Sequence, residues 1–151
     1  MMSIVPRPDA IVHDVAMFLL HPPQPEAAAA GVELHLEMSF APARFAALLA
    51  RLPDAVRVNY DSGNSASLGF HPDEEFAAYG ERIGSVHVKD RVRGGTTVPL
   101  GTGSVDMPAF FSGLRRIRYG GDIILQVARS EEGREVEWAR ANRAFVEAAI
   151  A

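Results

Sequence analysis

The sequence predicts an α/β fold with a parallel sheet, built from about four consecutive βα units. From residue 31 onward, short apolar runs alternate with longer stretches of helical period. The short runs are rich in Val, Ile and Leu, as is typical of strands buried on both faces of a parallel sheet. The length of 151 residues suits one ordinary domain.

Composition and charge exclude several classes of protein. With 48% hydrophobic and 23% charged residues the chain has enough apolar material for a core, which argues against disorder, collagen and coiled coil. The absence of cysteine excludes disulfides, thiolate zinc sites and a cysteine nucleophile, and it suits a reducing compartment. The formal net charge of -4 gives no reason to expect nucleic-acid binding. The apolar run at residues 11–20 is shorter than the about 20 residues that span a bilayer. We therefore expect a cytoplasmic protein without a nucleic-acid or membrane partner.

Each expected element follows from local signals. The four strands are expected at residues 32–37, 56–61, 83–89 and 122–127. The four helices are expected at residues 42–52, 72–82, 107–116 and 134–150. Pro42 and Pro72 open the first two helices, and Asp106 caps the third. Acidic residues 73–75 lie in the first turn of the second helix, where the helix dipole favours negative charge.

The two ends of the chain give weaker patterns. In the last helix, the residues expected to be buried are Val136, Trp138 or Ala139, Phe145 and Val146. Residues 1–25 read as a helical or irregular lead-in, with a helix at residues 9–20 and a break at the prolines of residues 21–25. Residues 26–31 are expected to end a helix at Gly31, so that the main domain covers residues 26–151.

A polar residue lies at or near the carboxyl end of every expected strand: Glu37, Asp61, His87 and Gln126. The carboxyl ends of parallel strands converge on the ligand crevice. Carboxylate, imidazole and amide groups suit a divalent cation such as Mn²⁺, Mg²⁺, Co²⁺ or Zn²⁺. A single acidic residue at a strand end is more often a helix cap or an arginine partner, but four such positions in register favour a metal site. His35, which shares a side with Glu37, is expected to pack or to support a ligand.

The loop at residues 89–103 is longer than the usual βα connection, as functional loops often are. Lys89, Arg91 and Arg93 accompany Gly-Gly and Gly-Thr-Gly sequences, which can bind an anionic oxygen through side chains and N–H groups. In the alternative interpretation the loop is solvated, and Lys89 and Arg91 pair with Asp90 or Asp106.

Four segments together resemble a known family. They are LHLEMSF (34–40), VNYDSGN (58–64), SVHVKDR (85–91) and VPLGTGSVDMPAFFSGLRRIRYGGDIILQ (98–126). Over residues 26–150 the sequence resembles the carboxyl-terminal half of the xylose-isomerase-like (β/α)8 superfamily, in particular its sugar-phosphate isomerases and epimerases. The resemblance implies a partial TIM barrel whose strands correspond to strands five to eight.

The resemblance also implies a chemistry. It makes Glu37, Asp61 and His87 ligands of a divalent metal and Glu37 a catalytic base that moves a proton through an enediolate. The fourth ligand position falls on Gln126 where the family has Glu, and a neutral amide cannot accept a proton. One-base aldose-ketose isomerisation is therefore easier to accommodate than two-base epimerisation.

The resemblance assigns substrate contacts as well. Asn64 falls near a position where relatives have a histidine that contacts substrate. Lys89, Arg91 and Arg93 match the region that binds substrate oxygens or phosphate. The expected partner is thus a small sugar or sugar phosphate.

The chain of 151 residues is too short for a complete (β/α)8 barrel, which needs about 250 residues. The chain is expected to be a fragment, to dimerise and close a barrel, or to flatten into an open sheet, and a homo-oligomer is expected because open edges are a liability. The leading hypothesis is a metal-dependent sugar-phosphate isomerase or epimerase that is truncated and inactive alone. The second is a non-catalytic barrel remnant or a carbohydrate- or phosphate-binding module. The third is a nuclease of the endonuclease IV type. The extra His and Glu ligands of such a nuclease are not evident in this sequence.

Overall fold

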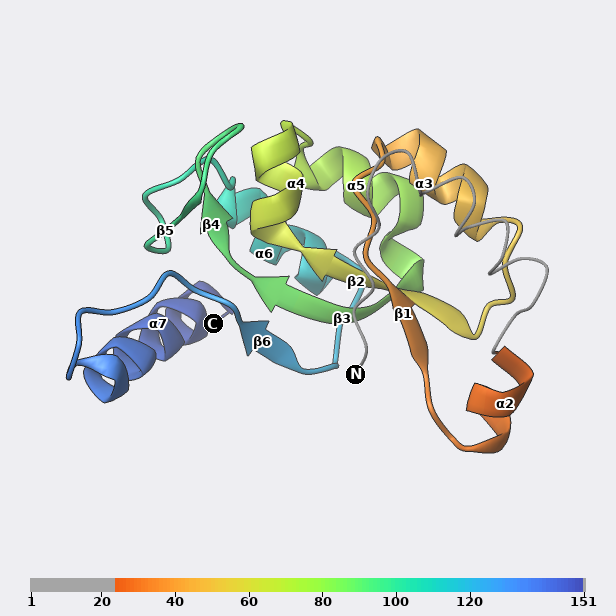
Figure 1. Ribbon diagram of the computed structural model, residues 1–151. Helices are drawn as coiled ribbons and strands as arrows, with labels where there is room; N and C mark the ends of the chain where they lie inside the picture. Colours follow the sequence, from red (N-terminus) through yellow and green to blue (C-terminus); the bar gives the residue numbers. More distant parts are fainter. Residues whose placement is uncertain (1–23, 151) are drawn as a thin grey trace.

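A four-stranded parallel sheet organises the molecule, and the computed structural model describes residues 24–150 (Figure 1). The order of the strands is β1 (Leu34–Leu36), β2 (Val56–Asp61), β3 (Ile83–Val88) and β6 (Ile123–Leu125), and all three neighbouring pairs are parallel. The predicted α/β class and parallel sheet are confirmed. The expected helix at residues 9–20 lies outside the described residues, as does nearly all of the expected lead-in.

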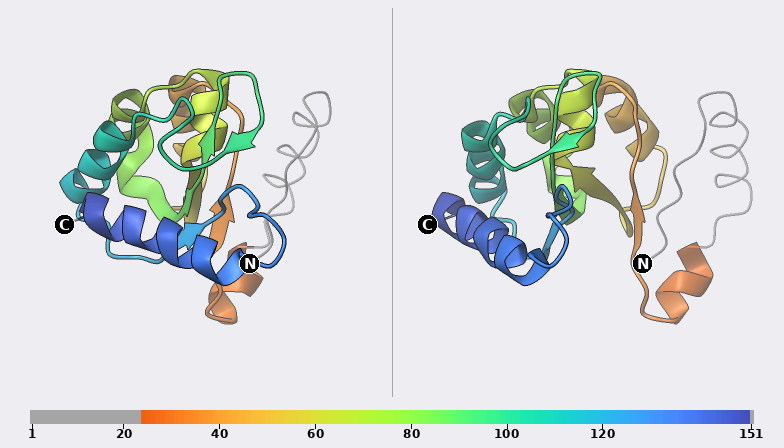
Figure 2. Two further views of the ribbon diagram at one scale, coloured as in Figure 1. Left: turned by 90° about the vertical axis from the view of Figure 1, so that its left-hand side faces the viewer. Right: turned by 60° about the vertical axis from the view of Figure 1, so that its left-hand side comes forward.

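Helices precede, connect and follow the strands, as the βα pattern predicts. They are α2 (Gln24–Ala29), α3 (Pro42–Leu49), α5 (Pro72–Tyr79) with the 3-10 turn η1 (Gly80–Arg82), α6 (Met107–Arg116) and α7 (Glu135–Ile150). Gly31 has a φ of +67° just after α2, as expected for a helix end. Figure 2 shows α6 and α7 on one side of the sheet, with β1 at the edge remote from α7. Of the helices in residues 24–150, none combines the length and the apolar character needed to cross a membrane.

The hydrophobic core lies between one face of the sheet and the helices. Alternate strand residues Val58, Tyr60, Val86 and Val88 point into it. The helices contribute an aromatic cluster consisting of Phe45, Phe76, Tyr79, Phe110 and Phe111. The Tyr60 ring is stacked on Phe110, with centroids 5.6 Å apart. Packing against the helices therefore holds this face of the sheet in place.

The opposite face of the sheet carries mainly polar residues, because strand side chains alternate between the two faces. The residues in this alternate set are His35, Glu37, Arg57, Asn59, Asp61, Ser85, His87 and Ile124. The register aligns Asp61 with His87, and His87 with Ile124. In a TIM barrel this is the face that lines the interior.

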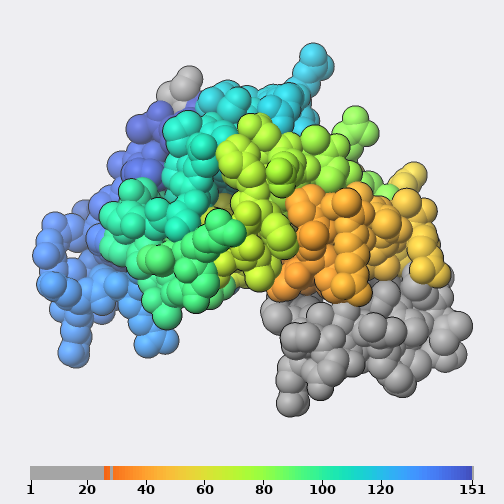
Figure 3. Space-filling view, turned by 90° about the horizontal axis from the view of Figure 1, so that it is seen from above, coloured from red at the N-terminus to blue at the C-terminus, as the bar shows by residue number. Residues whose placement is uncertain are grey.

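One helix and one ribbon lie where the sequence predicts only loops. Helix α4 (Ser62–Leu68) begins directly after β2, because the Asp61 carboxylate caps it by accepting the Asn64 N–H at 2.9 Å. Strands β4 (Asp90–Arg91) and β5 (Thr97–Val98) form an antiparallel ribbon within the long loop. Figure 3 shows this loop (green to teal) beside α4 (yellow-green), and the Gly94 N–H donates to the Ser67 carbonyl at 2.8 Å.

Candidate metal centre

Three of the four predicted ligands meet at the carboxyl ends of neighbouring strands. Glu37 directly follows β1, Asp61 ends β2, and His87 lies next to the end of β3. His87 Nδ1 lies 4.0 Å from Glu37 Oε2 and 3.9 Å from Asp61 Oδ2. One potential ligand atom of each residue lies within 4.8 Å of the others. Ligand atoms that bind one ion at about 2.1 Å lie about 3 to 4 Å apart, so a small adjustment would let all three bind one cation.

The state of the Asp61 carboxylate fits a cation. Its side chain is only 1% exposed, and Oδ1 is used by the α4 cap. Oδ2 is buried and accepts no hydrogen bond. Its near neighbour is the Lys89 ammonium at 2.9 Å, an ion pair whose angles do not make a hydrogen bond. A buried carboxylate oxygen that faces a positive charge is also suited to a metal ion.

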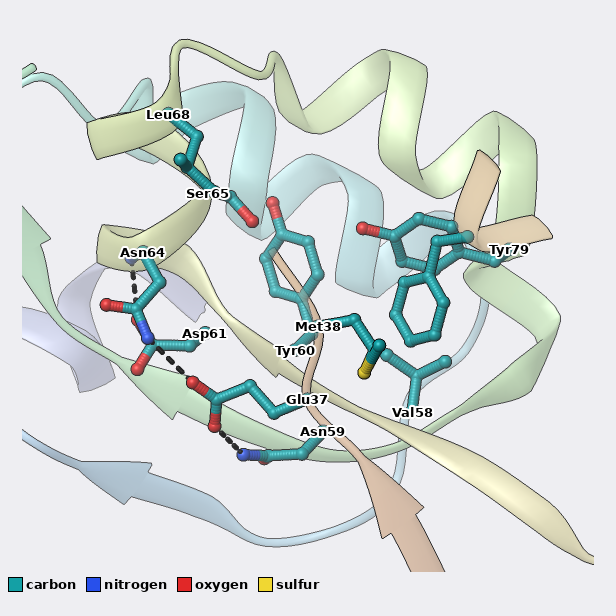
Figure 4. Close-up of a pocket in the computed structure, with 11 residues that line it drawn as sticks. Glu37, Met38, Val58, Asn59, Tyr60, Asp61, Asn64, Ser65, Leu68 and Tyr79 are labelled. Carbon is teal, nitrogen blue, oxygen red and sulfur yellow. Dashed lines mark hydrogen bonds between the residues drawn. The ribbon is translucent and has the colours of Figure 1, made fainter. Parts of the chain in front are cut away.

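Two asparagines hold the Glu37 carboxylate in place (Figure 4). The Asn59 side-chain amide donates to Oε2 at 2.7 Å, and that of Asn64 donates to Oε1 at 2.6 Å. The Asn59 amide nitrogen also lies 3.4 Å from His87 Nδ1, to which it can donate its second hydrogen. Asn64, predicted to contact substrate, therefore lies in the centre and positions the predicted base.

The chain of hydrogen bonds continues away from Glu37. Ser85 Oγ donates to Asn59 Oδ1 at 2.8 Å and is bonded to His35 Nδ1 at 2.7 Å. Sequence reasoning missed Asn59 and Ser85, although a signal was present. Each lies two residues before a predicted ligand on the same strand, and therefore on the same face.

Gln126, the fourth predicted ligand, follows β6 and has an exposed side chain. Its backbone N–H donates to the Val88 carbonyl at 3.0 Å, which extends the β3–β6 pairing by one residue. Within residues 24–150, no hydrogen bond joins its side chain to Glu37, Asp61 or His87. Its role as a ligand stays a prediction.

The three predicted substrate cations lie in different surroundings. Lys89 pairs with Asp61 rather than with Asp90 or Asp106. The Arg91 guanidinium donates to Asn64 Oδ1 at 2.9 Å and to the Gly95 carbonyl at 2.6 and 3.1 Å. Arg93 is exposed and packs on Gly69, where a Cβ would lie 2.6 Å from Nη2. Lys89 and Arg91 thus border the centre, whereas Arg93 lies at the other end of α4.

The glycines of the long loop serve a different purpose from the expected one. Asp90 is fully buried, and its carboxylate accepts the N–H groups of Gly101 and Gly103 at 2.9 and 2.8 Å and that of Val105 at 3.2 Å. These N–H groups are therefore occupied by the protein's own anion. This corrects the expectation that they bind a substrate anion, and any anion here would depend on side chains.

A third buried carboxylate, that of Glu75, lies beneath α4. Glu75 accepts hydrogen bonds from Tyr60 at 2.7 Å, Tyr79 at 2.6 Å and Ser65 at 2.7 Å. Burial raises the pKa of Glu75 above its ordinary value of 4.5, and burial beside this carboxylate also raises the pKa of Tyr60 and Tyr79. The sequence predicts Glu75 in the first turn of this helix, and α5 points it into the core, where it anchors α4.

Comparison with known proteins identifies the architecture. A xylose isomerase domain protein from Alicyclobacillus acidocaldarius superposes with a TM-score of 0.76 at 19% identity, over 98% of this chain and 61% of that one. A D-allulose 3-epimerase from Methylomonas sp. gives 0.73 at 20% identity, over 95% and 57%. A xylose isomerase-like TIM barrel protein from Mycobacterium smegmatis, in complex with magnesium, gives 0.67 at 21% identity, over 100% and 55%. No curated protein matches the sequence.

The chain thus spans between half and two thirds of the length of these three structures. At such identities the likeness shows the fold, which is a partial TIM barrel. The family model described as xylose isomerase-like TIM barrel matches residues 24–149, which include every strand of the sheet and the three clustered ligands. The chain belongs to the xylose isomerase-like TIM barrel family.

Proposed function

We propose that this chain forms the metal-binding part of a sugar isomerase or epimerase, with Glu37 as the base. The observation that carries the proposal is the cluster of Glu37, Asp61 and His87 at the carboxyl ends of three parallel strands, within 4.8 Å of one another. The names of the structural neighbours, which include a D-allulose 3-epimerase and an L-ribulose 3-epimerase, support a sugar substrate.

The proposed metal site uses the three clustered side chains, with Gln126 as a neutral fourth ligand. Mn²⁺, Mg²⁺, Co²⁺ and Zn²⁺ all suit such a set. A bound divalent cation would polarise the carbonyl and hydroxyl oxygens of a sugar and so make the adjacent C–H group more acidic. Asp61 and His87 would hold the cation, because each is placed by its strand and the α4 cap also orients Asp61.

Glu37 is the proposed proton carrier. Asn59 and Asn64 hold both of its oxygens, so its carboxylate keeps one orientation. It would remove the proton from C2 of an aldose and return it to C1 through an enediolate, while the hydroxyl proton passes from O2 to O1. Because Gln126 cannot act as a second base, this scheme favours aldose-ketose isomerisation over epimerisation by two bases.

The proposed substrate lies at the carboxyl ends of the strands, beside Glu37, Asp61 and His87. The cavity beside Glu37 has a volume of about 20 Å³, which holds about one water molecule and no sugar. Lys89 and Arg91 border the centre and are the proposed contacts for substrate oxygens or a phosphate, with Arg93 further out. The polar face is half of a barrel lining, so we also propose that a second copy of the chain covers it.

Exchange of solvent deuterium into substrate tests the proton transfer. The full chain, incubated with Mn²⁺ and a panel of ketoses and ketose phosphates, should incorporate deuterium beside the carbonyl, and Glu37→Gln should reduce the rate at least about a hundredfold. Glu33→Gln is the matched control, because Glu33 is a largely exposed carboxylate close in sequence that contacts His35. An equal rate in Glu37→Gln would overturn the role of Glu37.

A second candidate function is a barrel remnant that binds sugars without catalysis. The observation that favours it is Gln126, which places an exposed amide where the family has a carboxylate. Binding of sugar in calorimetry together with no deuterium exchange at any Mn²⁺ concentration would support this alternative.

A further inference from the structure

The only lysine of the chain lies in the candidate metal centre. Apart from its five histidines, all other basic residues of the 151-residue sequence are arginines. The Lys89 ammonium lies 2.9 Å from Asp61 Oδ2, and the Lys89 side chain is only 13% exposed. This oxygen belongs to the proposed ligand set and accepts no hydrogen bond. Lys89 therefore supplies positive charge at the atom that a metal ion would use.

The first turn of α4 holds Lys89 in this position. Ser62 Oγ donates to the Lys89 carbonyl at 2.7 Å and accepts the Lys89 N–H at 3.0 Å. The aliphatic stem lies so close to Gly63 that a Cβ there would be 2.7 Å from Lys89 Cγ. The backbone and the stem are thus fixed, and only the end of the side chain has freedom to turn.

We propose that Lys89 is an internal counter-cation of the metal centre, which leaves Asp61 when a divalent ion binds. The inference rests on the proposed metal site. Without a metal ion, the ammonium neutralises a carboxylate that is 1% exposed and costly to leave unpaired. With an ion between Glu37, Asp61 and His87, two positive charges would compete for the same oxygen. The ammonium therefore turns away from Asp61.

Displacement gives Lys89 a second task. Once released from Asp61, the ammonium is free to bind sugar or phosphate oxygens at the carboxyl ends of the strands, since its stem remains held by α4. The positive contact for substrate then exists only in the metal-loaded protein, so metal binds before substrate. A lysine suits this role because its ammonium is a compact charge on a flexible stem, whereas arginine has a broad planar guanidinium.

Titration with Mn²⁺ alone tests the competition. In Lys89→Met the stem is kept and the charge is lost, so the Kd for Mn²⁺ in calorimetry should fall at least about tenfold relative to wild type. The melting temperature of the metal-free variant should also fall, because Asp61 loses its counter-ion. Arg93→Met is the matched control. It removes one positive charge from the same loop at an exposed position outside the centre, and its Kd should change less than about twofold.

Amine labelling tests the displacement without any substitution. An amine-selective reagent can modify only Lys89 and the α-amine, because the chain has no other lysine. Mn²⁺ should increase labelling of Lys89, measured by peptide mass spectrometry, while labelling of the α-amine stays constant as an internal reference.

The outcomes separate the inference from the proposed function. An equal or weaker Mn²⁺ affinity in Lys89→Met, or Lys89 labelling that Mn²⁺ leaves unchanged although it binds, would overturn the inference and leave the metal site standing. No binding of Mn²⁺ by either protein would overturn the metal site and the inference together. If Lys89→Met fails to fold, the labelling of the wild-type chain decides.

Discussion

Glu75 shows how a single residue connects the core with the candidate site. The residue is 1% exposed, and hydroxyl groups from β2, α4 and α5 donate hydrogen bonds to its carboxylate. Ser65 is one of these donors and lies on α4, next to the Asn64 that holds Glu37. Glu75, whose pKa is raised by burial, is therefore linked through α4 to the residues of the candidate site.

This raised pKa predicts a pH dependence of stability. The unfolded chain releases the Glu75 proton near the ordinary value of 4.5, whereas the folded protein keeps it to higher pH. The folded state binds more protons in this interval, so the contribution of Glu75 to the free energy of unfolding is present below pH 4.5 and is lost as the pH rises through the raised pKa. Urea denaturation at a series of pH values should show this fall in wild type and a flatter profile in Glu75→Gln.

The control is Glu74→Gln, because Glu74 is the exposed neighbour on the same helix. Its stability profile should run parallel to that of wild type. Profiles of wild type and Glu75→Gln that also run parallel would show that Glu75 does not titrate above its ordinary range.

The site residues that lie at the ends of buried strands could be predicted from the sequence. The positions of Glu37, Asp61 and His87 at strand ends were predictable from the buried strands, and the structure places them together. The group around Glu75 was not predictable, since its partners come from elements far apart in sequence. The purpose of the loop glycines was also hidden, because only the folded loop brings their N–H groups to Asp90.

At the scale of elements, strong start signals gave accurate bounds. Residues 107–116 form α6 and residues 56–61 form β2, as predicted. The short helix α4 was missed because its sequence, SGNSASL, has no apolar period, and its formation depends on the Asp61 cap. Val136 is 66% exposed and Phe145 is 37% exposed, contrary to expectation. The reason is that α7 packs mainly on α6 and so buries only a narrow stripe.

The contact between α5 and α6 depends on a glycine. A Cβ at Gly113 would lie 2.5 Å from Phe76 Cδ2, and the Phe76 ring is itself held by Tyr60 and Phe110. Gly113→Ala should therefore lower the free energy of unfolding by about 1 to 2 kcal/mol, because overpacking outweighs the gain of about 1 kcal/mol in helix propensity. Chemical denaturation measures the difference.

Gly120→Ala provides the comparison, because nothing lies within 4 Å of a Cβ at that position. Its stability should stay within about 0.5 kcal/mol of wild type. A Gly113→Ala protein as stable as wild type would contradict the prediction, because the overpacking would then cost no more than the gain in helix propensity.

At the scale of the whole molecule, the sheet leaves two edges and one polar face. Within residues 24–150, β1 and β6 each pair with one strand only. Ile124 lies on the polar face and is exposed. In the complete barrels of the family, eight strands close on themselves and cover both features. Two copies of this four-stranded sheet, related by a twofold axis along the barrel, would together supply eight strands.

This geometry predicts self-association through the edges. In sedimentation velocity the chain should form a dimer in which β6 of one copy lies beside β1 of the other, because parallel pairing removes both free edges. Ile124→Lys places a charge on the face that would become the interior and should shift the equilibrium toward monomer at least about tenfold. Val136→Lys makes the same kind of change on the exposed surface of α7 and should leave the dimer intact. A wild-type chain that stays monomeric at all concentrations while unfolding cooperatively would contradict the prediction, because four strands would then tolerate both open edges unaided.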